Sequence, residues 1–367
     1  MQNILKDYVL KYHLIRHKNR MSRLAEKSNG YLLESALRTP LTFSEKQLIK
    51  ERWKNLIKFI DRGFPEYEMY KSRFGFNIDF VPYCYYLESL IDYFNPAYIK
   101  NTVGNKNFSQ LLFPNLVKPL SLIKNIDNVF YDDKNSIINI SQAIEIITTH
   151  EADLIIKPTQ HVGAGEGIAL LDSFSKTGIK HILENYKKDF IIQKKIHQCE
   201  TLDKLNSSSI NTLRITTLFV GNAVKVLSKT IRVGQAGALT DNVALGGIMI
   251  GVDDEGILYN EGYDRNLYPH TSHNGIVFGG MKIPHYNKVV SEVVKAHEAF
   301  PFLKIIGWDM ALDKDNNPIF IEANVYRPGI TVEQFCTGVI FGNDTKDIIK
   351  DAIRYYSTHA PVMKIQY

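Results

Sequence analysis

The stretch LKIIGWDMALDKDNNPIFIEANVYRPG, residues 303–329, has apolar runs at 304–312 and 318–323 on either side of a cluster of Asp and Asn. Such a cluster between two apolar runs is typical of a β-hairpin. If the hairpin closes symmetrically, Asp309 faces Glu322, and Asn324 projects to the same face because side chains alternate along a strand. Neighbouring carboxylates repel unless a proton or a cation lies between them, and an all-oxygen set suits Mg²⁺ held together with phosphates. The hairpin therefore predicts a metal site at Asp309, Glu322 and Asn324.

The spacing alone leaves an alternative open, in which Asp309 and Glu322 are solvated residues on the outer face of the hairpin. Two arginines upstream bear on this choice. Arg214 and Arg232 lie in strand-like runs with apolar neighbours, and a guanidinium on a core sheet needs an anionic partner. That partner is either an internal carboxylate or the phosphoryl and carboxylate groups of a substrate, which planar bidentate donors fit.

Three ordered motifs resemble the sugar-transfer-associated ATP-grasp family, whose members are encoded among polysaccharide-assembly functions. They are SSINTLRITT at 208–217, DNVALGG at 241–247 and GWDMALDKDNNPIFIEAN at 307–324, with Pro328-Gly329 after them. The resemblance runs from about residue 80 to 340. It implies an α+β ATP-grasp fold, in which two α+β subdomains clamp ATP, with a helical N-terminal region.

The length of 367 residues exceeds what one hydrophobic core usually organises, so more than one domain is expected. The length and the resemblance together predict four segments. We expect a helical or mixed region at 1–100, a nucleotide-binding subdomain at 101–197, a C-terminal subdomain with the metal site at 198–345, and a C-terminal helix or tail at 346–367.

The resemblance also implies a set of nucleotide ligands in the first of the two ATP-grasp subdomains. In the family an Asp-Lys-Asn element opens this subdomain and its lysine reaches the α-phosphate; here Gly104-Asn105 replaces the aspartate, which weakens the match at Lys106. A second lysine, Lys157, ends a short buried strand and is expected to bind phosphate. The glycine-rich stretch at 163–167 matches the mobile lid, although glycines of this kind also occur in plain turns. The run after Asp189 matches the adenine clamp, although it also fits an ordinary connector. The expected nucleotide ligands are Lys106, Lys157, Gly163, Gly165, Gly167, Gln193, Lys194, Ile196 and Glu200.

Four residues are assigned to the reacting groups. Arg214 and Arg232 are expected to hold the transferred phosphoryl group and a carboxylate, and Asn242 borders the same site by resemblance. Arg327 lies just before a helix whose N-terminus favours an anion.

Two helix starts are predicted from capping patterns. Ser44 is expected to cap the first, with Gln47 completing a capping box and Phe43 packing on Leu48. Thr331 is expected to cap the second, paired with Gln334, in a helix that ends near Gly342.

Composition limits the protein's environment and partners. Three widely spaced cysteines without a CxxC motif argue for a reducing compartment and against zinc. No run is long and apolar enough to span a bilayer, and the first residues do not read as a signal peptide, so a soluble cytoplasmic protein is expected. A net charge of +5 is compatible with anionic small substrates but does not indicate nucleic acid. Residues 1–27 read as a basic amphipathic helix, which either packs on its own domain or contacts an anionic membrane face.

The resemblance implies an ATP- and Mg²⁺-dependent carboxylate–amine ligase that forms an amide through an acyl phosphate. The expected substrates are a sugar acid, free or lipid-linked, such as a hexuronic acid of a surface polysaccharide, and an amino acid or other amine. Two alternatives stay open: an ATP-grasp phosphotransferase and a non-catalytic nucleotide-binding module. The intact Asp309, Glu322 and Asn324 set argues against the second alternative.

Overall fold

The computed structural model describes residues 15–25 and 36–358 apart from 151–152, 160–166 and 172–174, together with residues 12, 27 and 30. Its chain divides into two compact units. Unit 1 comprises residues 1–97, 266–268 and 326–367, and unit 2 comprises residues 98–265 and 269–325. Most of the basic stretch at 1–27 and the glycines Gly163 and Gly165 lie outside the described residues.

Unit 1 is helical in the part that the structure describes. Its elements are α2 (Phe43–Trp53), η1 (Ile60–Gly63), α3 (Phe64–Phe74), α4 (Tyr83–Tyr85), η2 (Tyr86–Leu90), α5 (Ile91–Phe94), α12 (Thr331–Thr337), η5 (Gly342–Asp344) and α13 (Thr345–Thr358). Gln334 on α12 joins segments distant in sequence, because its side chain bonds the backbone N–H and C=O of Val81 and the Tyr70 hydroxyl at 2.9–3.1 Å. All three residues are buried, so losing this amide would leave unpaired polar groups in the core.

Both predicted helix caps are displaced in the structure. Helix α2 is capped by Thr42, whose side chain accepts from Glu45 N–H while the Glu45 carboxylate accepts from Thr42 N–H. The prediction of Ser44 was wrong because Thr42 and Glu45 satisfy the same capping-box spacing two residues earlier. Phe43 is 80 % exposed and does not pack as a staple.

Helix α12 was also placed too late at both ends. Thr331 is its first residue rather than its cap, and the helix ends at Thr337, before Gly338. Gln334 does not complete a capping box, because Val81 and Tyr70 take its amide.

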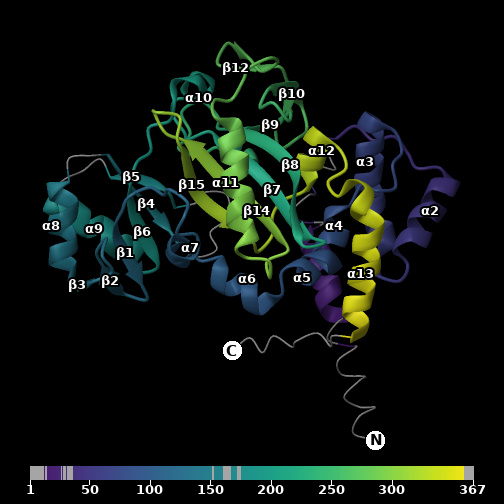
Figure 1. Ribbon diagram of the computed structural model, residues 1–367, viewed down its shortest axis with the longest axis horizontal. Helices are drawn as coiled ribbons and strands as arrows, with labels where there is room; N and C mark the ends of the chain where they lie inside the picture. The colour runs from purple at the N-terminus through teal and green to yellow at the C-terminus, as the bar shows by residue number, and fades with distance from the viewer. Residues whose placement is uncertain are drawn as a thin grey trace, which may run out of the picture. The chain divides into compact units, whose positions relative to one another are not determined.

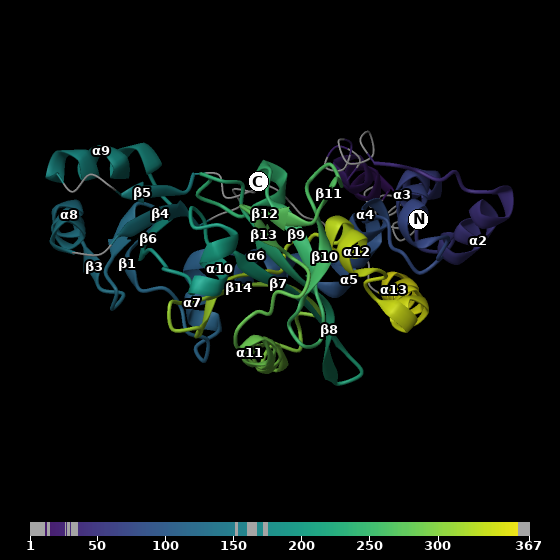
Figure 2. The same ribbon diagram turned by 90° about the horizontal axis from the view of Figure 1, so that it is seen from above.

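The first part of unit 2 contains a six-stranded sheet with strand order β3-β2-β1-β6-β4-β5. Helices α8 and α9 cover one face of this sheet (Figure 1 and Figure 2). Ile156 and Ile192 pack against these helices in one core cluster. Side chains alternate along strands, so Lys157 and Gln193 project to the opposite face. The elements before and within this part are α6 (Ala97–Val103), α7 (Lys106–Leu112), β1 (Ser121–Ile126), β2 (Val129–Tyr131), β3 (Ile137–Ile138), α8 (Ile140–Thr149), β4 (Leu154–Pro158), β5 (Ala169–Leu171), α9 (Lys176–Tyr186) and β6 (Phe190–Lys194).

The second part of unit 2 contains a seven-stranded sheet with strand order β11-β10-β9-β8-β7-β14-β15. Helix α11 lies along one face, as Figure 2 shows, and that face forms an apolar core that includes Leu213, Trp308, Met310 and Phe320. Polar side chains therefore gather on the other face. The elements are α10 (Glu200–Leu205), β7 (Thr212–Val220), β8 (Ala223–Val233), η4 (Val243–Leu245), β9 (Ile248–Val252), β10 (Leu258–Tyr263), β11 (Pro269–His270), β12 (Ser272–His273), β13 (Ile276–Val277), α11 (Tyr286–Glu298), β14 (Ile305–Leu312) and β15 (Pro318–Asn324).

The hairpin of β14 and β15 has the predicted pairing of Asp309 with Glu322. The register is not uniform, however, because Met310 pairs with Phe320 and leaves Ile321 as a bulge. An extra residue reverses the alternation of side chains beyond it. Phe320 can therefore join the apolar core while Glu322 remains on the polar face.

No helix among the described residues is long and apolar enough to cross a bilayer.

A candidate nucleotide and metal site

The polar face of the seven-stranded sheet is built around Asp309. Strand β7 lies between β8 and β14, and Arg214 is the direct cross-strand neighbour of Asp309. Arg214 Nε donates to Asp309 Oδ1 at 2.5 Å and Arg214 Nη2 donates to Oδ2 at 3.1 Å, a bidentate pair. Arg232 Nη2 reaches Asp309 Oδ2 at 3.0 Å. With Asp309 1 % exposed and Arg214 8 % exposed, each charge depends on the other for compensation.

Asp241 and Thr212 hold Arg232 in place from its other side. Arg232 Nε lies 3.3 Å from Asp241 Oδ2, and both Nε and Nη2 donate to Thr212 Oγ1 at 3.1 and 2.7 Å. The Thr212 hydroxyl in turn donates to Asp241. Burial raises the pKa of the Asp241 carboxyl, and the Arg232 charge opposes that shift. The sequence identified Asp241 only as part of a polar loop and missed Thr212, since neither follows from a strand pattern.

Glu322 and Asn324 complete the predicted metal set beside Asp309. Asn324 Nδ2 donates to Asp309 Oδ2 at 3.1 Å and to Glu322 Oε1 at 3.3 Å. The three side chains thus converge as the hairpin predicts. Among the described residues, no group of three or more His, Cys, Asp or Glu is arranged to hold a metal. Any cation here would rely on two carboxylates and one amide oxygen, which Asn324 would present after a half-turn of its terminal amide.

A lysine from α7 occupies the space beside these carboxylates. Lys106 Nζ lies 3.0 Å from Glu322 Oε2, and Glu322 raises the pKa of Lys106. Burial alone would raise the pKa of Glu322, but Lys106, Asp309 and Arg232 together hold that pKa well below its usual range. Asn105 caps α7 by accepting from Asn107 N–H at 2.9 Å. The aspartate missing from the family element is therefore replaced by a residue that starts the helix carrying Lys106.

The six-stranded sheet contributes Lys157 from β4. Lys106 N–H donates to Thr159 C=O at 3.1 Å, and Asn107 Nδ2 donates to Thr159 Oγ1 at 3.1 Å, so α7 is bonded to the end of that strand. Lys157 is buried, and burial, with a smaller effect of Lys106, lowers its pKa to about 8. A buried ammonium with a depressed pKa is poised to gain from an anionic ligand.

The two polar atoms of the Gln193 side-chain amide differ in their hydrogen bonding. Its Nε2 donates to Ser121 Oγ at 2.8 Å, whereas Oε1 is buried with no hydrogen-bond partner among the described atoms. A buried carbonyl oxygen without a partner is costly. It is therefore a ready acceptor for a donor such as an exocyclic amine.

The other predicted nucleotide ligands are placed as follows. Lys194 is exposed at the end of β6, and the backbone N–H groups of Lys194 and Lys195 are bonded to the carbonyls of Leu120 and Asp153. Ile196 is half-buried. Glu200 is exposed and pairs with Lys204 at 2.8 Å.

Gly167, the described residue of the glycine-rich stretch, has φ 74°. A Cβ there would come within 2.8 Å of the Pro158 side chain, so the position requires glycine.

Asn242 and Arg327, the other two residues expected near the reacting groups, contact residues close to them in sequence. Asn242 Oδ1 accepts from Ala244 N–H at 2.8 Å and caps η4, which positions the neighbouring Asp241. Arg327 belongs to unit 1, where its guanidinium lies 5.0 Å from the Tyr326 ring centre.

A family model described as sugar-transfer associated ATP-grasp matches residues 86–348, more than two-thirds of the chain. The chain belongs to this family. Membership confirms the expected α+β ATP-grasp fold. No curated protein sequence matches the chain.

Solved structures similar to this chain include several ATP-grasp ligases. An L-amino acid ligase from Bacillus licheniformis is 14 % identical with a TM-score of 0.42, covering 69 % of this chain and 48 % of that one. The ATP-grasp ligase PsnB is 12 % identical with a TM-score of 0.42, covering 71 % and 62 %. Biotin carboxylase from Campylobacter jejuni is 11 % identical with a TM-score of 0.43, covering 69 % and 46 %. The chain thus spans about half to under two-thirds of the length of these relatives.

Lys157→Met should stabilise the ligand-free protein at pH 7 by on the order of 1–3 kcal/mol. The native pKa of about 8 lies below the unfolded value of 10.5. Below pH 8, Lys157 therefore lowers the free energy of unfolding by its full amount. This destabilisation decreases as the pH rises toward 10.5. Urea unfolding of both proteins at pH 7 and pH 10 measures this difference. Lys180→Met, at an exposed lysine on α9, is the control and should change stability by under about 0.5 kcal/mol. If Lys157→Met stabilised the protein equally at pH 7 and pH 10, the lowered pKa of Lys157 would be contradicted.

Proposed function

We propose that this chain is an ATP-dependent carboxylate–amine ligase that joins an amine, such as an amino acid, to a sugar acid used in surface polysaccharide assembly. The observation that carries the proposal is the concentration of cationic side chains around two carboxylates on one polar face. Arg214 and Arg232 contact Asp309, Lys106 contacts Glu322, and Lys157 lies near both lysine and glutamate. Such a face suits the transfer of a phosphoryl group, which needs positioning and charge neutralisation more than covalent catalysis.

The nucleotide would be bound by the face of the six-stranded sheet opposite α8 and α9. Lys157 would contact phosphate oxygens, which would satisfy its buried charge. The unpartnered Gln193 Oε1 would accept a hydrogen bond from the adenine amino group. The keto group that guanine has at that position could not bind there in the same way, because it cannot donate a hydrogen bond. ATP is therefore expected to bind in preference to GTP.

The donor set also suits Mg²⁺, since Asp309, Glu322 and Asn324 offer only oxygen once the Asn324 amide is turned. When bound, the ion would neutralise phosphate charge and align the phosphates with the substrate. Lys106 and Arg232 would then be available to the phosphate oxygens instead of the protein carboxylates.

The proposed reaction has two steps. A substrate carboxylate oxygen attacks the γ-phosphorus, the bond to the bridging oxygen breaks, and ADP leaves. The amine then attacks the acyl carbon and inorganic phosphate leaves with the carboxylate oxygen. Arg214 and Arg232 would hold the carboxylate in line with the phosphoryl group and offset the charge of the tetrahedral intermediate. The amine loses a proton in this step, for which solvent is a sufficient acceptor.

Hydroxylamine tests the acyl-phosphate step directly. With ATP, Mg²⁺ and a panel of uronic acids, but no amine, hydroxylamine should intercept the activated acid and give a hydroxamate together with ADP and phosphate. Mass spectrometry detects the hydroxamate, and Arg232→Met should reduce its formation at least ~10²-fold. With the same acid, formation of a stable phosphate ester and no hydroxamate would favour the phosphotransferase instead.

Lys106→Met should tighten Mn²⁺ binding in the absence of nucleotide by about tenfold, equivalent to ~1.4 kcal/mol. The reason is that the ammonium group 3.0 Å from Glu322 competes with a metal ion for that carboxylate. Electron paramagnetic resonance measures free Mn²⁺ without requiring turnover. Lys204→Met, far in sequence and exposed, should leave the affinity unchanged. An affinity that falls or stays constant in Lys106→Met would show that Lys106 does not compete with the ion.

A further inference from the structure

Positive charge is concentrated in the first 62 residues of the chain. This segment has 14 Lys and Arg against 6 Asp and Glu, a net charge of +8, whereas residues 63–367 have 30 against 33, a net charge of −3. The segment precedes residue 86, where the family match begins, so the nucleotide site does not account for it. A strong charge difference between parts of one chain indicates a polyanionic partner, such as nucleic acid or an anionic membrane.

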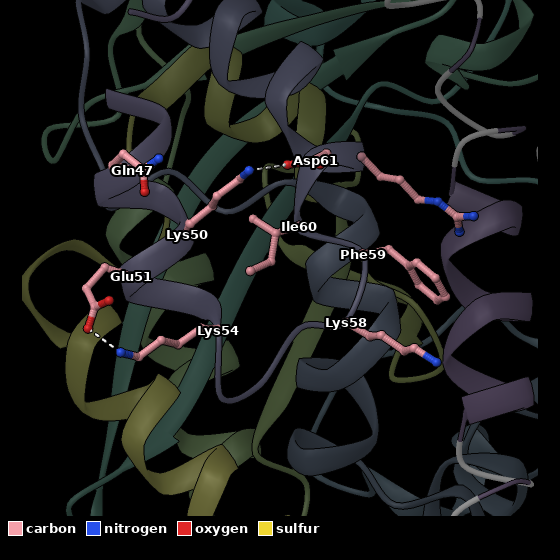
Figure 3. Close-up of a pocket in the computed structure, with 9 residues that line it drawn as sticks. Gln47, Lys50, Glu51, Lys54, Lys58, Phe59, Ile60 and Asp61 are labelled. Carbon is pink, nitrogen blue, oxygen red and sulfur yellow. Dashed lines mark ion pairs between the residues drawn. The ribbon is translucent and has the colours of Figure 1, made fainter. Parts of the chain in front are cut away.

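The described part of this segment forms a basic hollow on unit 1, between α2 and the chain around η1. Figure 3 shows Gln47, Lys50 and Glu51 of α2, with Lys54 just after the helix, on one side and residues 58–61 on the other. Two acidic side chains lie there, with Lys50 3.4 Å from Asp61 and Lys54 2.6 Å from Glu51. Lys58 and Arg62 add further positive charge, so the hollow has a net charge of +2.

The outer side of α2 combines these lysines with an exposed aromatic side chain. Phe43, Gln47, Lys50 and Lys54 recur at helical spacing and form one exposed stripe, the α2 face. Phe43 is 80 % exposed at its start. An exposed aromatic side chain in line with lysines places an apolar group and cations on one surface, and a membrane interface can bind both kinds of group.

We propose that the α2 face docks unit 1 on an anionic lipid bilayer. Lys50, Lys54 and Lys58 would contact headgroup phosphates, and Phe43 would enter the boundary between headgroups and acyl chains. Acyl chains bury such an apolar side chain, whereas the phosphate backbone of a nucleic acid offers it no apolar environment, so the exposed Phe43 favours lipid. The contact would bring the enzyme to acceptors held at the membrane.

Vesicle co-sedimentation of the full chain tests the proposal, and it needs neither nucleotide nor sugar acid. Its result is therefore independent of the ligase reaction. The wild type should bind vesicles of phosphatidylcholine with 30 mol % phosphatidylglycerol, and binding to phosphatidylcholine alone should be at least ~10-fold weaker. Raising KCl to 0.5 M should release the protein. The variant Lys50→Glu/Lys54→Glu/Lys58→Glu should lose at least ~10-fold in vesicle affinity, and Phe43→Ser, which alters no charge, at least about threefold.

A matched control changes three cations on another helix of unit 1. Lys346, Lys350 and Arg354 are exposed on α13 at intervals of four residues, and their replacement by Glu should alter vesicle affinity by less than about twofold. Thermal melts confirm that each variant is folded. The proposal fails if the wild type does not bind anionic vesicles, or if the triple variant at Lys50, Lys54 and Lys58 binds them as tightly as the wild type. It also fails if the two triple variants lose affinity equally, or if a DNA or RNA duplex binds through the same lysines more tightly than the vesicles do.

Discussion

A carboxylate buried between two guanidinium groups organises the polar face of the seven-stranded sheet. Asp309 is nearly inaccessible, accepts hydrogen bonds from Arg214 and Asn324, and forms an ion pair with Arg232. Removing one partner from such a network leaves an uncompensated buried charge, which costs about 3–5 kcal/mol. The strands that carry these residues are consequently held in one register, and the neighbouring Glu322 faces Lys106 in a fixed position. Substitution of Asp309 would therefore disturb the fold as well as the chemistry, and Glu322 is the better residue with which to probe the metal.

Much of this face could be predicted from the sequence because strand geometry is periodic. The pairing of Asp309 with Glu322 followed from the turn between the two apolar runs, and the need of Arg214 and Arg232 for anionic partners followed from their apolar neighbours. The bulge at Ile321 did not follow, since it lets Phe320 reach the core and depends on the packing of both sheet faces. The predicted pairing depends on the bulge, because the pairs next to the turn, Leu312 with Pro318 and Met310 with Phe320, would otherwise place Ile321 opposite Asp309. The extra residue shifts the register by one and brings Glu322 opposite Asp309.

The contacts that the sequence missed join segments with no pattern in common. The ion pair of Lys106 with Glu322 connects positions 216 residues apart, and no spacing rule reports it. Thr212 and Asp241 meet because β7 and the loop after β8 lie side by side. Cap positions failed for a different reason: Thr42 and Ser44 both have a hydroxyl group and a Glu or Gln three residues later, so the capping-box pattern fits either residue. Local chemistry thus identifies candidate residues, and tertiary packing selects among them.

The central claim is that the Lys157 and Gln193 face and the Asp309 hairpin of unit 2 bind one nucleotide together. Hydrogen exchange with a non-hydrolysable ATP analogue and Mg²⁺ tests it most directly. The account predicts slower exchange at amides 105–108, 159–167 and 193–198, and in the turn after Asn324, when calorimetry shows the analogue bound. Saturating analogue that leaves exchange unchanged in all four segments, or that protects only unit 1, would contradict it.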